Sequence, residues 1–337
     1  MQPIAYWLPV VWACLIGIGV VMYVLLDGFD LGAGILFLTG ATEEERDQMM
    51  NAVAPFWDGN ETWLVLGGAG LLVAFPLAYG IIMPALYLPL IVMLLALVFR
   101  GVAFEFRFVS KPNHRLWDRA FAAGSTLAAF CQGLVLGGFL MDIEVTGKQF
   151  SGGSFDWLTP FAIICALGLI AGYALLGAGW LMMKTEGALA ERARKIARAA
   201  LVITLCFIVA VSVWTPLASA RIEERWFGDS RLLYLWPVPI ATAAVAWVAW
   251  AGIRKGSGAQ TFLSAMALFL LCFLGLGIST FPYLVPATFT IWDAAAVPES
   301  QIFSLIGVLL FLPLVLAYTA FVYWTFRGKV SEGGGYH

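Results

Sequence analysis

The sequence is dominated by long apolar runs that are separated by short polar segments. A helix needs about 20 apolar residues to cross the hydrocarbon core of a bilayer. By that measure nine runs are long enough, near 7–38, 52–76, 79–104, 118–141, 158–183, 197–217, 232–252, 261–284 and 302–326. The pattern therefore predicts an all-α integral membrane protein with about nine transmembrane helices.

The boundary between the second and third runs needs a separate argument, because the two are nearly continuous. Phe75-Pro76 and the following Tyr79-Gly80 supply the predicted break, since proline disfavours helix in the residue before it. Merging the two runs would also put basic loops on both sides of the membrane. We therefore keep nine spans.

The connecting segments are all short, so residues 1–337 are predicted to form a single polytopic membrane domain. Two similar runs, FPLAYGIIMPAL near 75–86 and FPYLVPA near 281–287, each follow an apolar helix. They indicate two related halves, about 1–141 and 158–284, followed by an extra helix at 302–326. Chance similarity between proline-broken helix ends explains the two runs equally well.

Composition supports a membrane protein and excludes other classes. Hydrophobic residues make up 61% of the chain and charged residues only 12%, whereas a soluble domain carries about 25% charged residues. The sequence shows no basic face or nucleic-acid-binding motif. We therefore expect the lipid bilayer as surroundings and no nucleic-acid partner.

The basic residues give the predicted topology a direction. Fifteen of the 19 lysine and arginine residues fall in the loops after spans one, three, five and seven or at the C-terminus. Only Lys148, Arg221, Arg225 and Arg231 fall on the other side. The positive-inside rule then places the N-terminus outside and the C-terminus in the cytoplasm.

Four acidic residues near the predicted cytoplasmic end of the first two spans carry the candidate chemistry. Asp27 and Asp30 lie in LLDGFDLGAGIL, and Asp58 and Glu61 lie in FWDGNETWLVL with the same spacing. A carboxylate inside a membrane helix costs about 2.5–3.5 kcal/mol by insertion scales and commonly marks a proton or ion pathway. We predict a proton pathway here.

Simpler interpretations remain for part of this set. Asp58 and Glu61 could instead cap a helix N-terminus, where the helix dipole favours negative charge. Asp27 and Asp30 favour function, because apolar residues continue on both sides of them. Arg100, at the end of VMLLALVFRG, could neutralise one carboxylate or could snorkel to the membrane boundary.

Glycines flank the acidic pair of the first span at Gly28, Gly32 and Gly34. Small residues allow two membrane helices to approach closely. Helix packing explains these glycines without any cofactor.

Histidine gives the main negative argument. The chain has only two, His114 in the basic loop SKPNHRLWDR and His337 at the end. Intramembrane haem needs buried histidine, methionine or cysteine ligands, and neither histidine qualifies. We therefore expect no metal site and no cofactor bound by this chain alone.

Several runs in their order along the chain resemble subunit II of cytochrome bd-type quinol oxidases. They are DGFDLGAG, NAVAPFWDGNETWLVLGGAGLLVAFPLAY, LVFRGVAFEFR, FPYLVPATFTIWDA and AYTAFVYWTFRGKV, and together they span nearly the whole chain. The C-terminal GGGYH and the compact loops are more similar to the cyanide-insensitive branch.

The resemblance implies a partner and a reaction. Subunit I would carry two b-type haems, haem d and the quinol-oxidising site, and the complex would oxidise quinol and reduce dioxygen to water. It also implies two four-helix bundles plus one extra helix, in the bacterial cytoplasmic (inner) membrane. A small accessory transmembrane subunit and a structural quinone occur in some members, and no residues here are assigned to that quinone.

The resemblance also implies roles for individual residues. Asp27, Asp30 and Asp58 match the acidic positions of a cytoplasmic proton route, and Trp63 matches a position associated with oxygen access. The main alternative is a proton-coupled secondary transporter, for which intramembrane carboxylates and broken helices are also typical. A purely structural partner of subunit I is a third possibility.

Overall fold

The computed structural model describes residues 2–109, 114–228 and 235–330. Lys111, Arg231, His337 and the GGGYH ending, which the sequence analysis used, lie outside the described residues.

The first part of the chain forms seven α-helices and a short 3-10 helix. They are α1 (Gln2–Leu36), η1 (Phe37–Thr39), α2 (Glu43–Val53), α3 (Trp57–Glu61), α4 (Trp63–Ala74), α5 (Pro76–Ala85), α6 (Tyr87–Val109) and α7 (His114–Leu140).

The second part contains two small hairpins and six further described helices. They are β1 (Val145–Thr146), β2 (Gln149–Phe150), α8 (Pro160–Lys184), α9 (Gly187–Ala218), α10 (Ala220–Phe227), α12 (Pro237–Lys255), α13 (Gly258–Thr280), β3 (Tyr283–Val285), β4 (Phe289–Thr290) and α14 (Pro298–Thr325). Both hairpins are antiparallel.

The helices confirm an all-α membrane protein but not the count of nine. Within the described ranges, eight helices are each long and apolar enough to cross a membrane: α1, α6, α7, α8, α9, α12, α13 and α14. The helix predicted over 52–76 is wrong as a single element, because α3, α4 and α5 divide this part of the chain.

Prolines and a polar run explain the division of the second predicted span. Helix α2 ends at Val53, two residues before Pro55, and α5 begins at Pro76. Proline has no N–H to continue a helix but is suited to its first position. The predicted break at Phe75-Pro76 is therefore found, whereas Tyr79-Gly80 lies inside α5.

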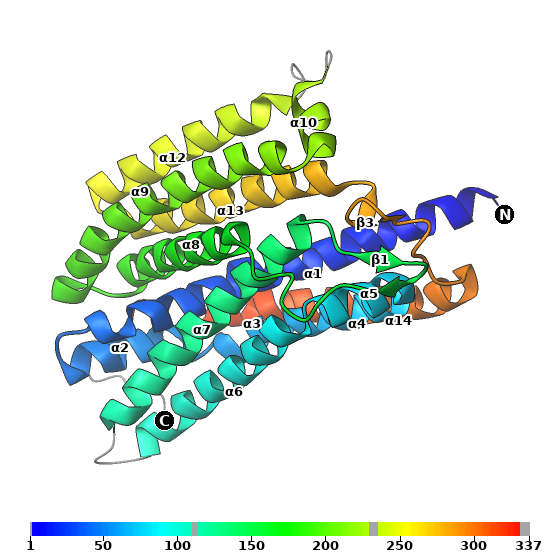
Figure 1. The fold of residues 1–337 in the computed structure, drawn as a ribbon. Helices are drawn as coiled ribbons and strands as arrows, with labels where there is room; N and C mark the ends of the chain where they lie inside the picture. The colour runs from blue at the N-terminus through cyan, green and yellow to red at the C-terminus, as the bar shows by residue number, and fades with distance from the viewer. Residues whose placement is uncertain (1, 110–113, 229–234, 331–337) are drawn as a thin grey trace.

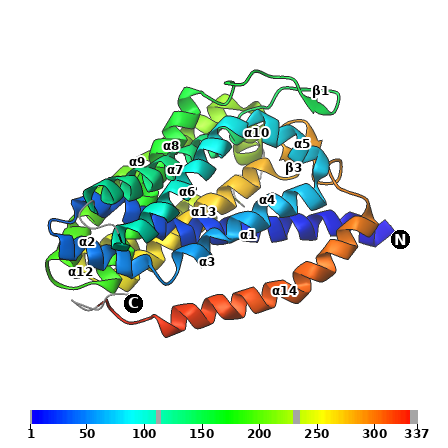
Figure 2. The ribbon, with the colours of Figure 1, turned by 90° about the horizontal axis from the view of Figure 1, so that it is seen from below.

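Helix α1 runs through the middle of the molecule and packs against α4, α7 and α8 (Figure 1). Helix α6 packs on α7, while α9 and α13 pack on α8, and α12 packs on α9 and α13. Helix α14 lies outside this bundle and contacts α1 and α4 (Figure 2). The division into two related halves stays a prediction.

The two proline motifs that suggested the halves fold differently. The run that begins at Phe75-Pro76 is helical as α5, whereas Phe281-Pro282 leads into strand β3. The two motifs therefore differ in local structure.

The two ends of the bundle differ, and we name them by what they carry. The α2 end carries α2 and the start of α7, and the hairpin end carries the chain's N-terminus and both β-hairpins (Figure 1).

Helix α2 is fixed at its start by Thr42, which accepts a hydrogen bond from the Glu45 N–H. Glu45 in turn accepts from the Ala41 N–H and from Arg192 of α9, and the Arg192 contact lowers the pKa of the Glu45 carboxyl. The start of α2 is therefore bound to α9 as well as to its own loop.

Glycine permits the close contact between α1 and α8. A Cβ atom placed on Gly32 would lie 1.9 Å from the Tyr173 carbonyl oxygen, and one on Gly177 would lie 2.3 Å from the Gly32 carbonyl carbon. No real Cβ makes such contacts, so the two backbones touch only because both positions lack side chains. This confirms the packing interpretation of Gly32.

Candidate functional site

The two aspartates of α1 lie fully inside the bundle. Asp27 is 0% and Asp30 is 2% exposed. Their spacing of three places them on neighbouring parts of one helix face, and that face points towards α3, α6 and α7 rather than lipid. Apolar residues of α1 surround them, so the sequence builds a helix that inserts readily and carries two carboxylates into the interior.

Arg100 of α6 binds two carboxylates at once. Its Nη1 donates to Asp27 Oδ1 at 2.7 Å, and its Nη2 donates to Glu61 Oε2 at 3.1 Å. The Arg100 side chain is 2% exposed, so it does not snorkel to the membrane boundary. The guanidinium instead joins α1, α3 and α6.

Asn60 of α3 completes the environment of Asp30. Its Nδ2 donates to Asp30 Oδ2 at 2.7 Å and to the Leu26 carbonyl at 3.3 Å. Its Oδ1 accepts from the Tyr323 hydroxyl of α14 at 3.0 Å. The peripheral helix α14 therefore reaches the site through one hydrogen bond.

We call these five residues the Arg100 cluster: Asp27, Asp30, Asn60, Glu61 and Arg100. Two carboxylate oxygens of the cluster, Asp27 Oδ2 and Asp30 Oδ1, are buried and have no hydrogen-bond partner among the described residues. An unpaired buried oxygen is costly, so each of these atoms is suited to bind a proton or a water molecule.

A second polar chain continues from the cluster into the bundle. Tyr23 lies one turn before Asp27 on α1 and accepts a hydrogen bond from Gln132 of α7 at 2.6 Å. Gln132 Oε1 accepts from the Tyr173 hydroxyl of α8 at 2.6 Å. Three helices thus share a hydrogen-bonded chain beside Asp27.

The remaining predicted residues lie outside the cluster. Asp58 is exposed on α3, within electrostatic range of Glu61. No side chain caps α3, and Glu61 binds Arg100, so helix capping does not explain Glu61. Trp63 is buried on α4, and its indole N–H has no hydrogen-bond partner.

Sequence reasoning missed four residues of this site, namely Asn60, Tyr23, Gln132 and Tyr173. Gln132 is a polar residue inside an apolar span, a signal that could have found it. The other three carry weaker signals, because tyrosine is common at membrane interfaces and Asn60 stands in a run that is already polar.

The described residues contain no group of three or more histidine, cysteine, aspartate or glutamate side chains that could hold a metal ion. His114 lies at the α2 end, 3.8 Å from Glu43. A separate apolar hollow on α9 is lined by Val209, Ala210, Val213, Trp214, Leu217 and Ala218.

Fold and site together define a class: a polytopic helical membrane protein with an ionisable cluster buried among its helices. The family described as cytochrome bd terminal oxidase subunit II matches residues 8–326. This chain belongs to that family and is therefore a membrane subunit of a terminal oxidase, an oxidoreductase complex.

Curated relatives match over nearly their whole length. Cytochrome bd-I ubiquinol oxidase subunit 2 of Escherichia coli (strain K12) is 27% identical, with 96% of this chain and 95% of the relative covered. A probable cytochrome oxidase subunit 2 of Haemophilus influenzae is 28% identical, with 95% and 94% covered. Cytochrome bd ubiquinol oxidase subunit 2 of Bacillus subtilis is 28% identical, with 95% and 96% covered.

A solved structure shares the fold. A chain in the structure of bd oxidase from Geobacillus thermodenitrificans superposes with a TM-score of 0.72 over 94% of this chain and 99% of that chain, at 17% identity. The family match sets aside the alternative of a proton-coupled secondary transporter.

Proposed function

We propose that this chain is the haem-free subunit of a quinol oxidase and that it delivers protons to a haem-bearing subunit I. The Arg100 cluster is the observation that carries this proposal. The names of the relatives, which include ubiquinol oxidases, support quinol as the electron donor of the complex. Dioxygen is the acceptor, and it is reduced to water in the partner.

The haems are assigned to the partner because no histidine of the described residues lies between the membrane helices of this chain. The described histidine, His114, lies at the end of the bundle next to Glu43 and not between the membrane helices. Two b-type haems and haem d in subunit I would supply electron transfer and oxygen reduction. A small accessory transmembrane subunit is a further proposed partner.

A charge count supports proton delivery through the cluster. Three carboxylates, Asp27, Asp30 and Glu61, lie beside the single guanidinium of Arg100. Burying excess negative charge is expensive, so a proton on one of the carboxylates offsets that cost. A group that holds a proton for this reason and has an unpaired oxygen is suited to take one up and pass it on.

Orientation follows from the charges at the two ends. Arg46, Arg107 and Arg192 lie at the α2 end, while Arg221 and Arg225 lie near the hairpin end, where they bind carbonyl groups of α13 (Figure 1). The positive-inside rule then assigns the α2 end to the cytoplasm and the N-terminus to the outside of the inner membrane. The Arg100 cluster lies nearer the cytoplasmic side in this arrangement.

Trp63 is proposed to line oxygen access. It is 3% exposed on α4 and belongs to the hydrophobic core that also contains Leu26 and Phe29, the neighbours of Asp27 and Asp30 along α1. An apolar path suits dioxygen, whereas the route through carboxylates suits protons. A structural quinone stays part of the proposal without assigned residues.

Replacing Asp30 with asparagine tests proton delivery. Asparagine has the same shape and can still accept the Asn60 hydrogen bond, but it cannot carry the proton. We expect Asp30→Asn to lower oxygen consumption by the purified complex about tenfold or more, with normal haem content in the visible spectrum. Asp293→Asn, at an exposed turn near the hairpin end, is the matched control. Full turnover of a haem-loaded Asp30→Asn complex would remove the proton-route assignment.

Asp58 tests whether the route reaches the protein surface on α3. We expect Asp58→Asn to slow oxygen reduction less than Asp30→Asn does, because the exposed Asp58 acts on the cluster only at a distance, through Glu61. Oxygen consumption and the haem spectrum are measured on the same preparation. A turnover equal to that of the unchanged complex would confine the route to the buried residues.

Co-purification tests the complex itself. An affinity tag on this chain should retain a haem-bearing subunit from detergent-solubilised membranes, with the spectrum of b-type haem and haem d. Isolation of the tagged chain without haem would contradict the oxidase assignment. Haem-loaded complexes in which both aspartate variants turn over normally would support a purely structural role.

A further inference from the structure

A second group of ion pairs lies at the α2 end, beyond the Arg100 cluster. Arg107 Nε donates to Asp118 Oδ1 at 2.6 Å, and its Nη1 donates to Asp47 Oδ1 at 2.5 Å. Asp118 Oδ2 also binds Arg46 at 2.9 Å. We call these four residues the Arg107 network: Arg46, Asp47, Arg107 and Asp118.

The Arg107 network connects the solvent to the interior. Asp47 is 46% exposed at the side chain, whereas Asp118 is 5% and Arg107 is 1% exposed. Arg107 Nη2 is buried without a hydrogen-bond partner. The network therefore begins at the surface with a carboxylate and ends inside with an unpaired donor.

The two groups lie on one face of α6. Arg100 and Arg107 are two helical turns apart, a distance of about 10 Å along the axis at 1.5 Å per residue. Phe104 lies between them on the same face and is 6% exposed. Both arginines point into the bundle. The protein therefore holds two charged layers, the Arg100 cluster and the Arg107 network, with aromatic rings between them.

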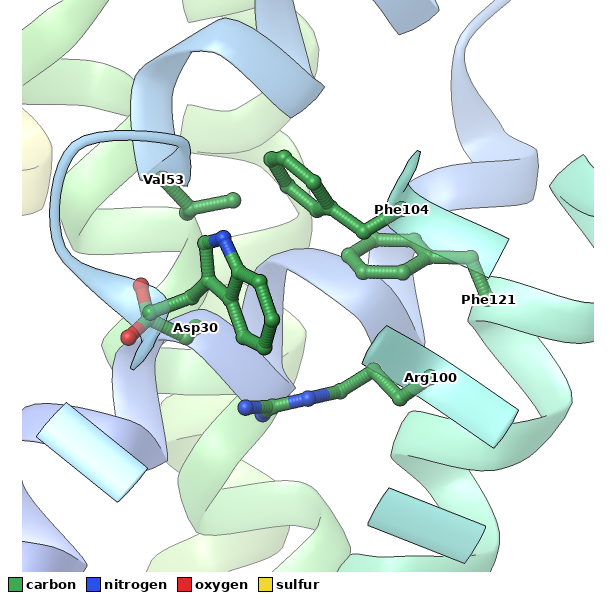
Figure 3. Close-up of a pocket in the computed structure, with 6 residues that line it drawn as sticks. Asp30, Val53, Arg100, Phe104 and Phe121 are labelled. Atoms are coloured by element: carbon green, nitrogen blue, oxygen red, sulfur yellow. The ribbon is translucent and has the colours of Figure 1, made fainter. Parts of the chain in front are cut away.

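A narrow cavity occupies the space between the layers. It is lined by Asp30, Val53, Trp57, Arg100, Phe104 and Phe121. Figure 3 shows Asp30 and the Arg100 guanidinium at one side and the rings of Phe104 and Phe121 at the other. In this arrangement the gap is narrower than a water molecule needs.

Aromatic rings close the side of the cavity that faces the Arg107 network. Phe121 contacts Phe37 at 5.0 Å between ring centroids, and Arg107 lies 5.4 Å from the Phe37 ring. Phe104 contacts Phe121 at 6.1 Å and Trp57 at 5.3 Å. These rings therefore stand between the Arg107 network and Asp30.

The unpaired atoms fall on both sides of this aromatic barrier. Asp30 Oδ1 belongs to a residue that lines the cavity, and Arg107 Nη2 lies beyond the rings. Water needs two to four polar partners to occupy an internal site. The carboxylate and guanidinium groups provide such partners at each end of an otherwise apolar gap.

From this geometry we infer that protons reach Asp30 from the Arg107 network through water that enters this cavity, and that Phe104 and Phe121 control its admission. The inference rests on the proposed proton route and adds the path by which protons enter that route. Asp47 presents a half-exposed carboxylate at the α2 end, and the aromatic barrier keeps the Arg100 cluster dry between transfers. Phe104 and Phe121 are positioning residues, since they act through water.

Filling the cavity tests this inference in the whole oxidase complex. Val53 is 1% exposed and lines the cavity. We expect Val53→Phe to lower oxygen consumption about tenfold, while quinol still reduces the haems at the normal rate without oxygen. Val202→Phe, at a half-exposed position of α9, makes the same substitution away from the cavity and should keep full turnover.

A size exchange separates blocked water from damaged packing. Phe104→Ala removes a ring opposite Val53, so the double variant Val53→Phe/Phe104→Ala should recover most of the lost turnover. Because a size exchange also relieves overpacking, the thermal transition of each variant is measured as well: blocked water predicts that Val53→Phe loses turnover with an unchanged thermal transition, whereas a purely structural role predicts that both fall together and recover together. Failure to recover, in a complex with a normal haem spectrum, would overturn the inference.

A smaller substitution covers the case in which Val53→Phe does not assemble. Val53→Cys is close to valine in size, and a small water-soluble methanethiosulfonate reagent should label it from the α2 end and slow turnover. Resistance to the reagent during turnover would contradict a hydrated cavity. The unchanged complex controls for the five native cysteines.

The aspartate variant distinguishes this inference from the proposed function. Slow turnover in Asp30→Asn together with normal turnover in Val53→Phe would overturn only the entry of protons through the cavity. Fast turnover in both variants would overturn the proton route as well. Slow turnover in both, with recovery in the size exchange, supports both.

Discussion

Arg100→Gln should destabilise the assembled complex by about 3–5 kcal/mol, the range for removing one partner of a buried ion pair. The substitution leaves Asp27 and Glu61 without their shared cation, and Asp27 is fully buried. The same contact holds α1, α3 and α6 together. We therefore expect a low yield of complex and a lower thermal transition in detergent, followed by loss of haem absorbance.

A second substitution shows whether charge is the cause. Arg100→Gln combined with Asp27→Asn removes both charges of the closest pair, and it should regain a large part of the lost stability. Arg119→Gln, on the exposed side of α7, is the matched control and should leave the thermal transition unchanged. A stable, fully haem-loaded Arg100→Gln complex would show that Asp27 is neutral or hydrated without Arg100.

Gly32→Ala should prevent normal packing of α1 on α8. The added Cβ would lie 1.9 Å from the Tyr173 carbonyl oxygen and 2.7 Å from the Gly177 nitrogen. These are backbone atoms, which cannot rotate away, so the cost should exceed the usual 1–3 kcal/mol or so for overpacking. The measurements are the yield of haem-loaded complex and its thermal transition.

Gly17→Ala is the matched control on the same helix. Its Cβ would lie 3.9 Å from the Phe273 ring, an ordinary van der Waals distance. We expect this variant to assemble normally. A Gly32→Ala complex with the same stability as Gly17→Ala would contradict the close contact between α1 and α8.

The fold was predictable wherever one apolar run makes one helix. The runs near 158–183 and 302–326 correspond closely to α8 and α14. The run near 52–76 failed as a single helix, because hydropathy averages over Pro55 and the polar residues that follow it. Composition shows that a segment can lie in a membrane, but backbone chemistry decides whether it is continuous.

The site was predictable as a set of residue types but not as a set of contacts. Asp27 and Asp30 stand out because a carboxylate in an apolar helix is costly. Sequence left Arg100 open between ion pairing and snorkelling, and only the packing of α6 on its neighbours decides between them. The hydrogen bond from Tyr323 could not be foreseen, since it joins residues 263 positions apart.

The ion pair between Asp27 and Arg100 also sets an order of events during synthesis. The two residues are 73 positions apart, so at bacterial elongation rates the arginine follows the aspartate by roughly 4 to 15 seconds. During that interval the nascent α1 holds its carboxylates without a counter-ion, and they are neutralised by protons or stay at the membrane edge. Tyr323 arrives last of all and gives Asn60 its final hydrogen bond. A chain that stops before α14 therefore completes the ion pairs of Arg100 but leaves Asn60 Oδ1 without the Tyr323 hydroxyl.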